Sequence, residues 1–102
     1  MKIIPMNNPR ITNKEVGIIK KAQAGDMSAF NKLFYKYKTF VADLIEDYIH
    51  DRDEAEDLVN VVFMKVYDKL STFQDYSSFG GWLRIVTQRA AIDYLRKNKN
   101  TT

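Results

Sequence analysis

The sequence of 102 residues has no cysteine, two prolines and a single histidine. Without cysteine, disulfides, thiolate metal sites and a cysteine nucleophile are excluded, as a reducing intracellular compartment permits. No window approaches the roughly 20 apolar residues of a membrane span. The first residues also lack the long apolar run and small-residue cleavage site of a signal peptide. We therefore expect a soluble, cytoplasmic protein.

Charge is distributed unevenly along a chain whose 45% apolar content suits one domain with a modest core. Residues 1–38 carry eight basic and two acidic residues, and residues 79–102 carry five basic and one acidic. Between them, residues 43–57 hold eight acidic residues and one arginine. Solvated helix faces produce such runs by default, but the separation also suggests two partners of opposite sign, with nucleic acid at the basic end.

The beginning of the chain predicts a lead-in followed by a short helix. Residues 1–11, with both prolines, are expected to be extended or disordered. Thr12 and Glu15 have the spacing of a capping box, and Gly25 is placed to end the helix that they begin. Its expected inward residues are Val16, Ile19 and Ala22.

A second, longer helix has the strongest apolar period in the sequence, and Asp26 is its predicted N-cap. Its outer face is basic early and acidic late, opposite to the order that the helix dipole favours. Tertiary packing or a partner, rather than local helix stability, therefore explains those charges. His50 follows in a turn, where a lone histidine among acids indicates no chemistry. The inward residues are Phe30, Leu33, Phe34, Tyr37, Val41, Leu44, Ile45 and Tyr48.

The central helix is predicted over residues 53–70, with Asp53 as its N-cap and Glu56 completing a capping box. Val61 and Met64 are out of place on its outward face. They are either ordinary exposed apolar residues or the centre of a docking surface, and both interpretations stay open. The expected inward stripe is Ala55, Leu58, Val59, Val62, Phe63, Val66, Tyr67 and Leu70.

A polar loop over residues 71–78 follows the central helix. Phe73 and Phe79 are expected to anchor it to the core, whereas Tyr76 has no apparent core to reach. Aromatic side chains in a loop are also suited to stacking on unpaired bases. Ser78 is the predicted N-cap of the last helix, which is expected to start at the pair Gly80 and Gly81.

The last helix combines an apolar side with a side rich in arginine and glutamine, the type of element that can lie against phosphates and read base edges. Its predicted inward residues are Trp82, Leu83, Val86, Ala90 and Tyr94. Its outward residues are Arg84, Gln88, Arg89, Arg96 and Lys97.

Three segments occur together in order: DEAEDLVNVVFMKVY at 53–67, the aromatic series Phe73, Phe79 and Trp82, and AIDYLRK at 91–97. With this order and spacing the sequence resembles region two of bacterial RNA polymerase sigma factors, most closely the extracytoplasmic-function (ECF) type. The resemblance covers about residues 15–98. It implies an all-α fold, a compact bundle of about four helices forming a single domain over residues 12–99.

The resemblance also implies two partners. The central helix would dock on the clamp helices of the largest subunit of RNA polymerase core, and the loop and last helix would bind the non-template strand of the promoter minus-ten element and help to melt it. The implied polymerase-binding residues are Asp57, Asn60, Val61, Met64, Lys65 and Asp68. The implied DNA-binding residues are Phe73, Gln74, Tyr76, Ser77, Ser78, Arg84, Gln88, Arg89, Arg96 and Lys97. An anti-sigma factor is a further candidate partner, and no cofactor, metal or small-molecule substrate is implied.

The sequence departs from the family pattern at functional positions. Asn60 and Val61 stand where the family usually has glutamine followed by an acid, which weakens charge-assisted docking. Arg89 stands where asparagine is usual, which favours phosphate over base contact. We also expect no second DNA-binding domain within the chain.

These departures keep a second hypothesis open. The chain would then be an interaction module, an adaptor or decoy, that binds polymerase or self-associates through Val61 and Met64 without reading promoter sequence. An enzyme is the least supported class, because no nucleophile, acid–base pair or phosphate-cradling glycine loop is evident. Asp43, Asp47 and Asp51, spaced by four, fit a solvated helix face better than a magnesium site.

Overall fold

The computed structural model describes residues 12–100, with the backbone alone for the last two. The lead-in predicted at residues 1–11 lies outside the described residues. Within them the chain is all-α, as predicted, with four α-helices, two 3₁₀ segments and no strand. The helices are α1 (Asn13–Gln23), α2 (Met27–Glu46), α3 (Arg52–Lys69) and α4 (Phe79–Asn100), and the 3₁₀ segments are η1 (Leu70–Thr72) and η2 (Tyr76–Ser78).

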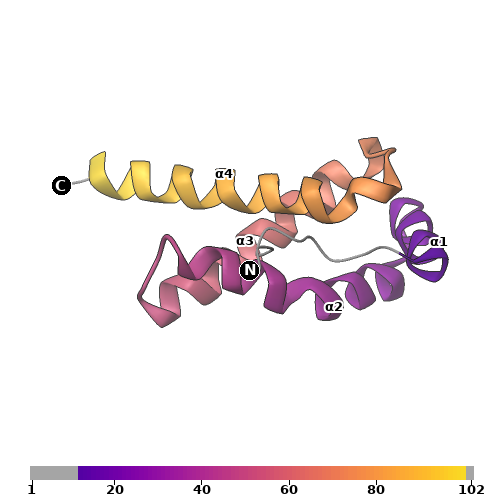
Figure 1. Cartoon of the computed structure of the whole chain (residues 1–102), viewed down its shortest axis with the longest axis horizontal. Helices are drawn as coiled ribbons and strands as arrows, with labels where there is room; N and C mark the ends of the chain where they lie inside the picture. Colours follow the sequence, from indigo (N-terminus) through magenta and orange to yellow (C-terminus); the bar gives the residue numbers. More distant parts are fainter. Residues whose placement is uncertain (1–11, 101–102) are drawn as a thin grey trace, which may run out of the picture.

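The helices enclose one shared core. Figure 1 shows the long helices α2 and α4 side by side, with α1 near the end of α2 where that helix begins. Helix α3 contacts both α2 and α4. Each helix contributes one apolar face, and the residues buried at its centre include Ile19, Leu33, Val41, Ile45, Val62, Val66 and Leu83. The inward positions predicted from the period are thus confirmed at the centre of each stripe.

The capping residues of α1 and α2 are the predicted ones. The Glu15 amide donates to Thr12 Oγ1 at 3.2 Å, and the Thr12 amide donates to Glu15 Oε1 at 3.0 Å, which completes the capping box. Gly25, with φ of 101°, turns the chain after α1 in a conformation that glycine adopts at little cost. Asp26 caps α2 by accepting from the Ala29 amide at 3.1 Å.

The capping box predicted at Asp53 is wrong, because α3 begins earlier. Asp51 is the N-cap, and its carboxylate accepts from the Glu54 amide at 2.9 Å. Asp53 therefore lies in the first turn, where its charge is favourable to the helix dipole. The apolar period cannot choose between two aspartates so close together, since both precede the first buried residue.

Two further local predictions differ from the structure. Helix α4 begins at Phe79, one residue before the predicted glycine pair, so Ser78 directly precedes it; Ser78 also belongs to η2, and its hydroxyl donates to the Asp75 carbonyl at 3.1 Å. Tyr67, predicted inward, is 51% exposed and meets Phe30 edge to face at 5.3 Å between ring centroids. Tyr67 lies at the margin of the apolar stripe of α3, and the neighbouring helices do not cover the whole width of this stripe.

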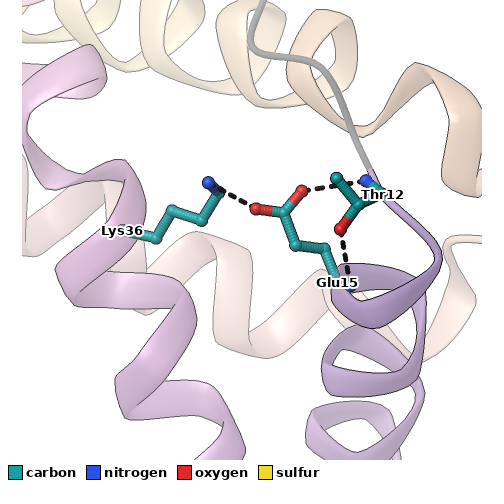
Figure 2. Close-up of polar contacts among 3 residues, drawn as sticks. All are labelled: Thr12, Glu15 and Lys36. Carbon is teal, nitrogen blue, oxygen red and sulfur yellow. Dashed lines mark hydrogen bonds and ion pairs between the residues drawn. The ribbon is translucent and has the colours of Figure 1, made fainter.

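A buried polar contact joins the beginning of α1 to α2. Glu15 is buried, and Figure 2 shows its carboxylate between Thr12 and Lys36. One oxygen accepts from the Thr12 amide and the other forms an ion pair with the Lys36 ammonium. A buried charge is tolerated when it is paired and hydrogen-bonded in this way. The contact therefore adds a polar link between the first turn of α1 and α2 to the apolar packing of Ile19 and Ala22.

Among the described residues no helix has the combination of length and apolar character that crossing a membrane requires.

Candidate functional site

The residues predicted to face outward on α3 are all exposed. Val61 is 40% exposed and Met64 is 67% exposed, although both are apolar. The polar members of the set are exposed around them: Asp57, Asn60, Lys65 and Asp68. The outward face of α3 is therefore an apolar centre edged by carboxylates, as the sequence predicts.

The structure divides this face between two grooves. Asn60, Met64 and Asp68 line a groove between α2 and α3. Its other lining residues are Met27, Phe30, Phe63 and Tyr67. This groove is largely apolar, and it contains three aromatic rings and two methionines, whose flexible side chains adapt readily to an apolar partner.

The second groove lies between α3 and α4 and has a different character. Val61 and Lys65 line it together with Asp93, Tyr94 and Lys97 of α4. Lys65 and Lys69 also border Arg89 a little farther along. Lys65, expected with the polymerase residues, is thus placed beside residues expected on the DNA side.

The loop between α3 and α4 is held by an aromatic cluster. The ring of Phe73 packs on Trp82 with centroids 4.8 Å apart and planes 30° apart. Phe73 also meets Phe79 at 5.7 Å and Tyr76 at 6.0 Å, both edge to face. Phe79 is buried, so the prediction that Phe73 and Phe79 anchor the loop is confirmed.

The expectation that Tyr76 has no core to reach is wrong. Its ring is half-buried in this cluster, and its hydroxyl donates to Gln23 Oε1 at 2.9 Å. The Lys20 ammonium lies 5.4 Å from the ring centroid, over the ring face. Tyr76 is thus anchored at its hydroxyl, and an exposed lysine lies over one face of its ring.

The tip of the loop carries a fixed negative charge. Ser77 donates to Asp75 Oδ1 at 2.8 Å, and hydrogen bonds from Ser77 and then Ser78 hold the pKa of Asp75 below its ordinary value. Gln74, Ser77 and Ser78 are exposed beside it. A carboxylate at this point disfavours contact of the tip with phosphates.

The polar residues predicted on α4 do not share one environment. Arg84 is half-buried, with its guanidinium carbon 5.5 Å from the centroid of the Phe40 ring on α2, so its predicted outward position is wrong in part. Gln88 is also half-buried. Arg89 and Lys97 are exposed, and Arg96 is exposed with one nitrogen 3.9 Å from Asp93 Oδ1.

Three residues beside these surfaces are not among the predicted site residues. Lys69 and the 48%-exposed Ile85 line the α3–α4 groove, and Gln23 binds the loop. The position of Lys69 one turn beyond Lys65 was a usable signal. Gln23 carries no such signal, since its partners are 47 to 53 residues away in the sequence.

The fold and these surfaces define a small helical domain with an exposed apolar patch edged by carboxylates on one helix and a basic final helix behind an aromatic loop. A family model described as Sigma-70 region 2 matches residues 33–101. The chain belongs to the sigma-70 region 2 family.

The curated relatives of the chain include bacterial RNA polymerase sigma factors, among them sigma-E factors of the ECF type. It is 33% identical over 78 residues to the RNA polymerase sigma-H factor of Pseudomonas aeruginosa, covering 76% of this chain and 40% of that protein. It is 35% identical over 78 residues to the ECF RNA polymerase sigma-E factor of Escherichia coli K12, with the same two shares. The chain spans about two fifths of the length of these curated relatives.

A solved structure has the same fold. An engineered region 2 of sigmaE, determined by NMR in complex with GTAAAA, aligns with a TM-score of 0.80 and 27% sequence identity. The alignment covers 89% of this chain and 97% of that one.

Proposed function

We propose that this chain is a transcription initiation domain that binds RNA polymerase core through α3 and binds single-stranded minus-ten promoter DNA through the loop and α4. The observation that carries the proposal is the fold shared with a sigma region 2 that was solved with a GTAAAA oligonucleotide. The exposed surfaces of this chain provide the residues for both contacts. Because bacterial polymerase and promoters are cytoplasmic, the proposal implies a cytoplasmic location.

The polymerase contact is assigned to the outward face of α3 and the adjoining α2–α3 groove. The exposed Met64 offers apolar area to a helical partner such as the clamp helices of the largest subunit. Asp57 and Asp68 place carboxylates around it. Asn60 and Val61 supply no charge, so apolar contact contributes more to docking here than the family pattern implies.

The DNA contact is assigned to the exposed loop tip and the cations of α4. The carboxylate of Asp75 favours bases over phosphates at the tip, while Arg89, Arg96 and Lys97 provide charge for the backbone of the same strand. Because this arrangement engages unpaired bases, binding stabilises the melted promoter over the duplex.

Capture of polymerase tests the first contact. Met64→Glu puts a charge at the centre of the proposed docking face. We expect it to capture purified core enzyme, from the species that encodes the chain, with at least about tenfold lower affinity, which is a loss of about 1.4 kcal/mol of binding free energy. Ile92→Glu, which changes a 42%-exposed apolar residue on α4, is the matched control and should capture core like the unaltered chain. An unaltered chain that never captures core would remove this contact from the proposal.

The adaptor or decoy function is the second candidate, favoured by Arg89 and its lysine neighbours. Arg89 borders Lys65 and Lys69, a grouping that suits any phosphate backbone. This candidate predicts equal affinity for GTAAAA and for the permuted oligonucleotide AAGATA across a range of salt concentrations. A preference for GTAAAA excludes it.

A further inference from the structure

One side chain at the end of α1 ties the loop down at three points. The Gln23 amide nitrogen donates to the Leu70 carbonyl at 2.9 Å and to the Phe73 carbonyl at 2.6 Å. The Gln23 amide oxygen accepts from the Tyr76 hydroxyl at 2.9 Å. Both ends of a single amide thus hold the first residue of η1, the residue that follows η1 and the first residue of η2.

The loop has little other polar support. Neither η1 nor η2 has a side-chain cap. The remaining side-chain hydrogen bonds found in this part of the described chain are local, from Thr72 to Lys69 and from Ser77 and Ser78 to Asp75. They span three residues at most and cannot fix where the loop lies relative to the helices. The hydrogen bonds of Gln23, by contrast, join the loop to α1.

The chemistry of these bonds requires an amide that reaches from α1. Two carbonyls need two N–H donors and the hydroxyl needs an acceptor, a combination that among side chains only asparagine and glutamine provide. Helix α1 is itself held on α2 by the contact of Glu15 with Lys36, which Figure 2 shows. The amide of Gln23 is therefore presented from a fixed helix.

We propose that Gln23 is the positioning residue of the recognition loop, holding residues 70–78 in the conformation that presents the loop tip to a nucleic-acid base. This inference rests on the proposed function for its ligand, but the hold on the loop is a property of the chain alone. Gln23 itself reads no base. It acts through the backbone at Leu70 and Phe73 and through the Tyr76 hydroxyl.

Hydrogen exchange of the free chain tests the hold on the loop. The amides of Phe73, Tyr76 and Ser78 donate within the loop and report its opening. We expect Gln23→Met, which keeps the length of the side chain and loses its donors and acceptor, to speed exchange of these amides at least about tenfold, given three lost hydrogen bonds. Tyr76→Phe removes one bond of the three and should give a smaller acceleration.

The control for exchange is Asn31→Met, which removes an exposed amide from α2. It should leave the loop amides unchanged, and the core amide of Val41 should exchange alike in all variants. Loop amides that exchange equally in Gln23→Met and in the unaltered chain would overturn the inference. General acceleration that includes Val41 would overturn it as well, because it would mark a structural role without positioning.

Binding then tests what the position is for. We expect Gln23→Met to lose most of the preference for GTAAAA over AAGATA. Its affinity for AAGATA should stay within about twofold of that of the unaltered chain, since the side chains of α4 that would contact the phosphate backbone of the DNA are unchanged. A retained preference with a loosened loop would overturn the positioning role. If the unaltered chain shows no preference while loop exchange still depends on Gln23, the proposed function fails and the hold on the loop stands.

Discussion

Tyr37 carries a buried polar atom without a partner. Its side chain is 1% exposed, its ring meets Phe79 at 5.1 Å, and its hydroxyl has no hydrogen-bond partner among the described residues. Burial, and secondarily the negative charge of Glu15, raise the pKa of Tyr37 to about 12. The folded chain therefore holds this hydroxyl in its neutral form well above the ordinary value of 10.0.

This pKa predicts a specific alkaline instability. The folded pKa lies above the unfolded one, so ionisation of Tyr37 does not affect the free energy of unfolding below pH 10 and lowers it as the pH rises from 10 toward 12. Over that interval the loss of unfolding free energy is on the order of 2–3 kcal/mol.

We expect Tyr37→Phe to unfold at equal or higher temperature at pH 7, since an unpaired buried hydroxyl costs about 1–3 kcal/mol. The variant should also show a flatter decline of unfolding free energy above pH 10. Parallel alkaline profiles for the two proteins, measured by urea unfolding, would contradict the assignment.

Gln23 and Tyr76 show, at the same scale, where inspection of the sequence reaches its limit. Thr12 with Glu15, and Asp26 ahead of its helix, are recognisable because the interacting groups are three residues apart. Gln23 and Tyr76 are 53 residues apart, and only packing of α1 against the loop brings them together. The same sequence reading placed Tyr76 outside the core, because the loop by itself shows no apolar period.

At the scale of elements, α1 contains one glycine and is followed by another, and the two differ in backbone conformation. Gly25 turns the chain after α1 with φ of 101°, whereas Gly17 lies within α1. A β-carbon added at either position meets no atom within 4 Å. Substitution at each site therefore tests backbone conformation without steric interference.

These two positions give opposite predictions for the same substitution. Gly25→Ala forces a left-handed conformation on alanine and should lower the free energy of unfolding by about 1–2 kcal/mol. Gly17→Ala improves helix propensity and should raise it by about 0.5–1 kcal/mol. Urea unfolding of both variants at pH 7 measures the two changes. Effects of equal sign would show that the turn after α1 is not formed as described.

The positions of the helices were more predictable from the sequence than their exact ends and the grooves between them. Apolar spacing located all four helices, because burial of one face imposes the period of the helix. It did not choose Asp51 over Asp53 as the cap of α3, and it did not reveal that Val61 and Met64 face different grooves. The division of that face depends on where α2 and α4 lie, which no single helix encodes.

For the molecule as a whole, the main consequence of its charge pattern is an exposed cationic track that crosses from one helix to another. Lys65 and Lys69 of α3 border Arg89 of α4, and Lys97 lies farther along the same groove. The ion pairs found within the described residues involve none of these four side chains. Asp93 is the carboxylate that lines the same groove among the described residues, so the four cations outnumber it and leave the groove net positive for an anionic partner.

Salt dependence measures the contribution of this track to nucleic-acid binding. If Arg89 contacts a phosphate, Arg89→Asn should reduce the magnitude of the slope of log K against log salt by about 0.7 for single-stranded GTAAAA. The preference over AAGATA should hold or increase, because a phosphate contact carries no sequence information. Lys14→Asn, which makes the same change of charge at the exposed start of α1, should leave the slope unchanged. Equal slopes for the two variants would mean that net charge, not position, governs binding.

The attachment of α1 bears on how far this chain can be shortened. The family match begins at residue 33, whereas the amide that holds the loop belongs to residue 23. A shortened chain that starts at residue 33 would keep the aromatic cluster and the cations of α4. It would lose the capping box, the partner of Lys36 and the hold on Leu70 and Phe73 together. The segment that matches the family model therefore leaves out Gln23, a residue that holds the loop over residues 70–78 in place.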